Sequence, residues 1–156
     1  MGTFSQCKIT TINNHFTRKA ERLNDIYYNT LLLEYDLSNS ININYLRNTF
    51  NGSQLYKLIL PTIGSNFTFS GSPFGNKLEF VEAPHPIMAN IPINSTSVLR
   101  EQSILNLIAA AAANVTYTLH ATVYAKCATG GEWHADVQAA LDAKAAEGYT
   151  VTLISA

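Results

Sequence analysis

Side chains suited to ligand contact recur along this chain at a fixed 23-residue interval. One set is Thr11, Glu34, Lys57 and Phe80, and the second is Asn13, Asp36, Ile59 and Glu82. Carboxylates beside an exposed aromatic ring would suit a sugar or a peptide as a ligand. The alternative is that these residues form an ordinary sheet face that contacts only water. We therefore predict a binding surface formed by Glu34, Asp36, Lys57, Ile59, Phe80 and Glu82.

Apolar residues at the same interval indicate the elements that would carry this surface. Segments 4–9, 27–32, 50–55 and 73–78 share one pattern, and three of them continue with apolar residues at fixed spacing. These residues are Leu32, Tyr35 and Leu37, then Leu55, Leu58 and Leu60, then Leu78, Val81 and Ala83. The first copy is weaker, since Ile9 and Ile12 fit and Asn14 does not. The spacing predicts short strands in which Tyr35, Leu58 and Val81 superpose.

A fixed period of this length is typical of a solenoid, in which each copy stacks on its neighbours. We expect an α/β fold: a solenoid with a parallel sheet, capped at its C-terminal end by a strand-helix-strand unit. The length of 156 residues fits a single domain, 1–156, with repeats over 4–84 and a cap of helices and strands over 85–156. Between the strands, residues 17–26 have helical composition, and 62–72 are typical of turn or strand.

The C-terminal part predicts a different arrangement. Ser97 is a plausible N-cap for an amphipathic helix that includes residues 104–112. A long strand is expected over 115–126, with His120 on its solvated side, followed by a capping box at 129–132 that opens a second helix. Gly148 fits the end of that helix, and the last strand follows with Tyr149, Val151 and Leu153. This strand should add to a parallel sheet.

The repeat Phe50-Asn-Gly-Ser-Gln-Leu-Tyr-Lys-Leu-Ile-Leu-Pro61 resembles the BspA-type leucine-rich repeat. Residues 103–108 and 144–151 resemble the C-terminal unit that follows such repeats in surface and virion proteins of gut bacteria and their phages. The resemblance implies a leucine-rich-repeat solenoid that serves attachment or recognition, with ligands on the concave sheet face. Ser53 stands where the family usually has a cysteine.

Composition narrows the function classes. Ten basic and eleven acidic side chains give a net charge of −1, so bulk charge does not favour nucleic acid or an anionic membrane. The four histidines, His15, His85, His120 and His134, lack metal-ligand spacing, and no phosphate-binding or nucleophile motif occurs. Asp136 and Asp142 are expected to be surface charges. We predict no enzyme activity, no cofactor and no metal.

The two cysteines and the N-terminus give further expectations. Strand stacking places Cys7 and Cys127 roughly 20 Å apart, beyond bridging distance, so both should be free thiols. The chain has no recognisable signal peptide or membrane-spanning segment. Residues 1–15 would leave an uncovered apolar edge, which predicts a preceding domain or a homo-oligomer partner there.

Two functional hypotheses follow. The first is a non-catalytic recognition or attachment module, displayed on a bacterial surface or a phage particle, that binds protein or glycan. The second is a structural assembly element of a virion fibre or appendage, whose faces are subunit contacts. Cell binding or glycan binding would favour the first, and a stable homotrimer without a ligand would favour the second.

Overall fold

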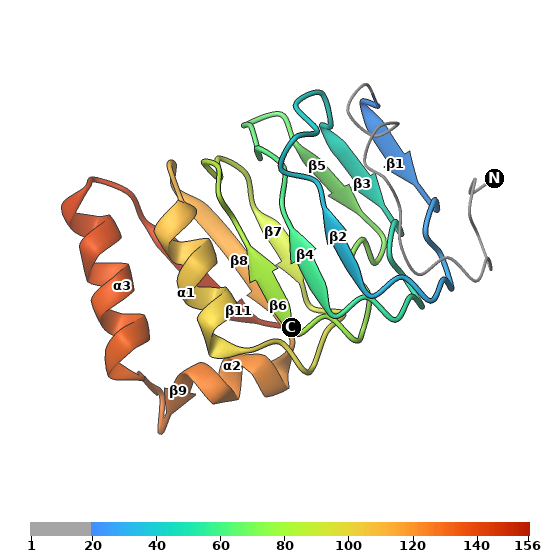
Figure 1. Ribbon diagram of the computed structural model, residues 1–156. Helices are drawn as coiled ribbons and strands as arrows, with labels where there is room; N and C mark the ends of the chain where they lie inside the picture. Colours follow the sequence, from blue (N-terminus) through green and yellow to red (C-terminus); the bar gives the residue numbers. More distant parts are fainter. Residues whose placement is uncertain (1–19) are drawn as a thin grey trace.

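The computed structural model describes residues 20–156 and is a mixed α/β structure with parallel sheets (Figure 1). The elements in chain order are β1 (Arg22–Asn24), β2 (Glu34–Asp36), β3 (Tyr45–Arg47), β4 (Lys57–Ile59), β5 (Thr68–Ser70), β6 (Phe80–Glu82), β7 (Ile91–Ile93), α1 (Glu101–Ala110), β8 (Val115–Leu119), α2 (Ala121–Cys127), β9 (Ala128–Thr129), β10 (Glu132–Trp133), α3 (Ala135–Ala146) and β11 (Val151–Ser155). Sheets from the first half lie at one end of the molecule, and the helices lie at the other.

The first half of the described chain forms two three-stranded parallel sheets, ordered β1-β3-β5 and β2-β4-β6. Each step from a strand to its neighbour in either sheet advances the chain by one sequence period, as from Arg22 to Tyr45 or from Glu34 to Lys57. In the second sheet Tyr35 pairs with Leu58, and Leu58 pairs with Val81. The predicted register of these three residues is therefore confirmed.

The helical expectation for residues 17–26 is wrong where the structure describes that segment, because β1 and a turn occupy it. Leu23 lies in register with Leu46, which pairs with Phe69, and tertiary pairing of these apolar side chains outweighs the helical propensity of the residues around Leu23. The prediction of turn or strand over 62–72 is confirmed by β5.

Turns after these strands use the left-handed backbone region at the same period. Asp25, Asn48 and Gly71 have φ angles of 50°, 45° and 61°. Asparagine, aspartate and glycine tolerate this region better than other residues, so each of these turns can take the same direction. The side-chain Oδ1 of Asn48 also accepts a hydrogen bond from the backbone N–H of Ser72, at 2.9 Å. The sequence period is thus built into the turns as well as the strands.

One apolar core runs between the two sheets and continues into the C-terminal part. All nine predicted anchors belong to it or pack on it: eight are buried, and Ala83 is partly buried. Two buried hydroxyls close the turns beside the core. Thr30 donates to the carbonyl of Tyr27 at 3.0 Å, and Ser53 donates to the carbonyl of Phe50 at 2.6 Å. The hydroxyl of Ser53 is therefore a second donor to the Phe50 carbonyl, which also accepts the backbone N–H of Ser53.

The C-terminal part begins with a third line of parallel contacts, in which single bridges join Ile63 to Ile87 and Ile87 to Ala111. It then forms the parallel sheet β11-β8-β7, with Leu153 opposite Tyr117 and Tyr117 opposite Ile91. The expected final strand in a parallel sheet is confirmed. So is the helix end near Gly148, which has a φ of 90° just beyond α3.

Three local predictions for this part are wrong. The strand expected over 115–126 ends at Leu119, because His120 caps α2 by accepting the N–H of Thr122. The expected capping box at 129–132 is instead the turn of the hairpin β9-β10, where both glycines have positive φ. Ser97 is not the N-cap of α1, which begins at Glu101 after Arg100.

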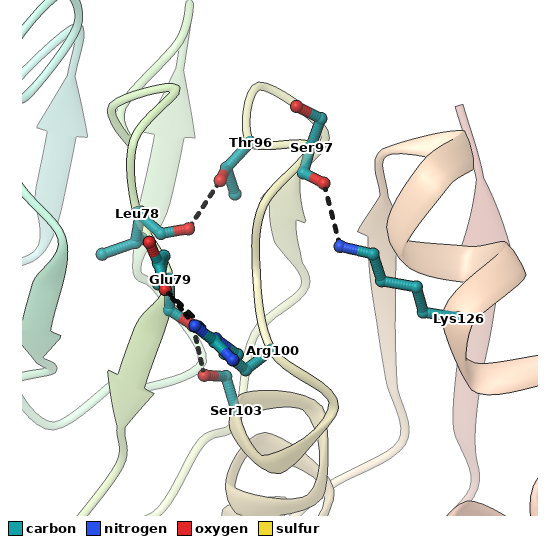
Figure 2. Close-up of polar contacts among 7 residues, drawn as sticks. All are labelled: Leu78, Glu79, Thr96, Ser97, Arg100, Ser103 and Lys126. Atoms are coloured by element: carbon teal, nitrogen blue, oxygen red, sulfur yellow. Dashed lines mark hydrogen bonds and ion pairs between the residues drawn. The ribbon is translucent and has the colours of Figure 1, made fainter.

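Helix α1 lies along β6, the last strand of the β2-β4-β6 sheet (Figure 1). Ser103 accepts the N–H of Val81 at 2.9 Å and donates to the carbonyl of Glu79 at 3.0 Å, while Asn106 donates to the carbonyl of Val81 at 3.0 Å. Figure 2 shows the contacts around the start of this helix, including the hydrogen bond that the hydroxyl of Thr96 donates to the carbonyl of Leu78. Side chains of α1 therefore occupy backbone groups of β6 that another strand would otherwise pair with.

Candidate functional site

The six predicted surface residues lie on one face of the β2-β4-β6 sheet. Glu34 pairs with Lys57 and Lys57 with Phe80, while Asp36, Ile59 and Glu82 form the second row. The central residue of each strand is buried and the flanking residues are exposed or half-buried, as alternation along a strand requires. Thr11 and Asn13, which the pattern adds to the two rows, lie outside the described residues.

Charged side chains on this face are held by local contacts. Lys57 Nζ lies 2.7 Å from Glu82 Oε1, and this carboxylate raises the pKa of Lys57. The hydroxyl of Tyr56 donates to Glu34 Oε1 at 2.6 Å, which raises the pKa of Tyr56. Asp36 accepts the backbone N–H of Ser38 at 2.8 Å. The carboxylates of this face thus lie at fixed positions, and Lys57 offsets only part of their charge.

An aromatic pair extends the face beyond the predicted residues. Phe80 is 38% exposed, and the ring of Tyr56 meets it edge to face at 6.2 Å between centroids. The guanidinium of Arg100 lies 5.5 Å from the centre of the Phe80 ring. The same group pairs with Glu79 at 2.8 Å, as Figure 2 shows. With Lys57, the face thus offers ring surface, carboxylates and two cations within a small area.

Sequence reasoning missed Tyr56, Glu79 and Arg100. Leu33, Tyr56 and Glu79 follow one another at the same interval as the predicted rows, so the period could have identified them. Leu33 directly precedes β2 and is 49% exposed, so it adds apolar surface next to Glu34. Arg100 lies outside the repeats, and only the structure brings it to the ring of Phe80.

A groove of about 830 Å³ begins where the sheet face ends at Glu82. Its walls are the segment after β6, the small residues near the end of α1, and the end of α3 with Lys144 and Glu147. Lys144 is buried and its Nζ lies 2.8 Å from Glu147 Oε2. The ammonium group of Lys144 in this groove is therefore neutralised by its ion pair.

The histidines that the structure describes make structural contacts. His85 Nε2 lies 3.0 Å from the carbonyl oxygen of Ser38. His120 is the cap of α2, so its predicted place on the solvated side of a strand is wrong. His134 Nδ1 lies 2.9 Å from Glu101 and its Nε2 lies 3.1 Å from the hydroxyl of Thr129, so this ring joins α1 to the β9-β10 hairpin. His15 lies outside the described residues.

Other predicted groups can also be placed. Asp136 and Asp142 are exposed on α3. Within residues 20–156 no group of three or more histidine, cysteine, aspartate or glutamate side chains is arranged to hold a metal ion. Cys127 is a buried free thiol, and burial raises its pKa to about 11. Cys7, and with it the expected separation of the two thiols, lies outside the described part of the chain, as does the predicted apolar edge at residues 1–15.

Comparison with protein-family models, with curated proteins and with solved structures finds no match to this chain. Among the helices of residues 20–156, none has both the length and the apolar character needed to cross a membrane.

Proposed function

We propose that the chain is a non-catalytic recognition or attachment module built as a BspA-type leucine-rich-repeat solenoid. The fold part of this proposal is supported by the constant sequence offset between paired strands in both sheets of the first half. The resemblance of the repeat segments to that family adds the expectation of display on a bacterial surface or a phage particle.

The observation that carries the functional proposal is the alignment of Glu34, Lys57 and Phe80 in one row of the β2-β4-β6 sheet. A ligand that lies across the strands would meet a carboxylate, an ammonium group and an aromatic ring at ~4.8 Å steps. Tyr56 orients the Glu34 carboxylate, and Arg100 adds a second cation beside Phe80. Such a surface suits a protein or glycan ligand with both polar and apolar groups.

The test is the double variant Glu34→Ala/Phe80→Ala, measured by binding of labelled protein to bacterial cells, host cells and a glycan array. Binding should be lost. Because Phe80 packs on Tyr56 and Arg100, the melting temperature should also fall, so circular dichroism has to show that the variant is folded at the temperature of the assay. Glu132→Ala/Ile154→Ala is the matched control, since it also removes an exposed carboxylate and an exposed apolar side chain, but from the C-terminal part.

Unchanged binding by Glu34→Ala/Phe80→Ala would exclude this sheet face as the site. A stable oligomer that binds no cell or glycan would instead favour the assembly-element hypothesis, in which the faces are subunit contacts. Light scattering on the purified chain distinguishes these outcomes.

A further inference from the structure

A second hollowed surface is lined by residues of β5 and β7, which belong to other sheets than the charged face of β2-β4-β6. It consists of two hollows of about 560 and 430 Å³ that share Ser65 and Phe67. No aspartate, glutamate, lysine, arginine or histidine lines either hollow. The 830 Å³ groove, in contrast, includes Glu82, Lys144 and Glu147. We call this uncharged double hollow the neutral face.

Asparagines mark the neutral face at a regular interval. Asn42, Asn66, Asn90 and Asn114 follow one another at a 24-residue spacing, and each lines one of the two hollows. The same spacing separates Ile63, Ile87 and Ala111, which are joined by parallel bridges. The carboxamides therefore recur in step with these paired segments, which lie ~4.8 Å apart where they pair.

Two of these carboxamides are held in one orientation. Asn90 Oδ1 accepts the N–H of Thr116 at 2.7 Å, and Asn114 Oδ1 accepts the N–H of Thr150 at 2.8 Å. A carboxamide whose oxygen is occupied in this way retains two N–H donors on its nitrogen. Both asparagines are exposed, so these donors are available to a ligand and lose little freedom when they bind it.

Apolar side chains and hydroxyls complete the neutral face. Ile41 is 78% exposed and Met88 is 44% exposed, and each lines one hollow. The hydroxyl-bearing residues Thr68 and Thr118 line the larger hollow. Each hollow therefore combines one exposed apolar side chain with uncharged polar groups, a composition that suits a ligand with both kinds of surface.

We propose that the neutral face binds an uncharged polysaccharide. Sugar hydroxyls match the carboxamide donors and the threonine hydroxyls, and the apolar faces of pyranose rings match Ile41 and Met88. The donors of Asn90 and Asn114, which lie one 24-residue interval apart, fit a ligand that itself repeats. An anionic or cationic ligand would find no opposite charge here and would lose hydration on binding. The inference does not depend on the charged sheet face and stands if that proposal fails.

The test is affinity electrophoresis of the full chain in gels that contain one polysaccharide each: dextran, hydroxyethyl cellulose, galactomannan or xyloglucan as neutral probes, and alginate as the charged probe. Asn90→Asp/Asn114→Asp is the decisive variant. Aspartate keeps the oxygen that accepts the backbone N–H of Thr116 or Thr150, but it removes both N–H donors and adds charge. The fold should therefore be retained, as circular dichroism and the melting temperature would check.

We expect retardation of the wild type by at least one neutral polysaccharide and not by alginate. The double variant should show about a 10-fold or greater loss of affinity for the neutral probe, from two lost hydrogen-bonding groups. Asn39→Asp/Asn76→Asp, which adds the same charge at exposed positions outside both hollows, should bind like the wild type. No retardation by any neutral probe, or equal affinity of Asn90→Asp/Asn114→Asp and the wild type, would overturn the proposal.

Discussion

Leu58→Ala should destabilise the protein by ~2–5 kcal/mol, because Leu58 is fully buried at the centre of the middle strand β4. Its side chain lies between those of Tyr35 and Val81 in the two neighbouring strands. Since strands bound both sides, the backbone cannot move in to fill the space, and a cavity should remain. A loss of ~3 kcal/mol would lower the melting temperature by roughly 6–12 °C for a chain of this size.

Urea denaturation followed by circular dichroism and tryptophan fluorescence measures this loss. Ile59→Ala is the control, because Ile59 is the next residue, loses an aliphatic group of the same size, and is only half-buried on the opposite face. It should cost clearly less than Leu58→Ala. A cost below ~1 kcal/mol for Leu58→Ala, or an equal cost for both variants, would refute the register.

Three further perturbations test the turns and the C-terminal core. Ser53→Ala should cost ~0.5–1.5 kcal/mol in urea denaturation, because the carbonyl of Phe50 loses one of its two donors and keeps the backbone N–H of residue 53, and Ser53→Cys should cost less. Gly52→Ala should destabilise by ~1–2 kcal/mol because its φ is 70°, whereas Gly64→Ala, with open space where the Cβ would lie, should be near neutral; equal melting temperatures would contradict this. The thiol of Cys127 should react with a thiol reagent only after unfolding. Because burial raises its pKa from 9.0 to about 11, the unfolded thiol ionises first, so stability should fall as pH rises through this window, and Cys127→Ala should lessen that fall.

The register of the β2-β4-β6 sheet could be predicted because its signal repeats. A single Leu-x-x-Leu-x-Leu segment is ambiguous, but three copies with Tyr35, Leu58 and Val81 at one interval leave a single way to superpose them. The six residues of the charged face followed from the same period, since alternation fixes which side chains point away from the core.

The other sheet was not predicted as a sheet, although Leu23, Leu46 and Phe69 also follow the 23-residue interval. Leu23 is buried while Arg22 and Asn24 are exposed, so β1 has no alternation long enough to distinguish it from a helical segment. The helix α2 was missed for a related reason. Val123 continues the apolar alternation of β8, and only the cap formed by His120 ends the strand.

Parts of the candidate sites depend on contacts between distant segments. Arg100 reaches Phe80 because α1 lies along β6, and Lys144 reaches the groove because α3 lies beside α1. Neither follows from a local pattern. The asparagines of the neutral face do have a sequence signal, but their spacing differs by one position from the period of the sheets. It becomes meaningful only once the bridges between Ile63, Ile87 and Ala111 are known.

The hydrogen bonds from Ser103 and Asn106 of α1 to the backbone of β6 determine which edge of the β2-β4-β6 sheet can take another strand. Because they occupy the edge of β6, the β2-β4-β6 sheet cannot recruit a strand from a neighbouring molecule at that end. Because these bonds come from side chains, the packing of α1 on β6 depends on the residue types at Ser103 and Asn106. Within residues 20–156, a further strand could therefore add to this sheet only at β2, its opposite edge.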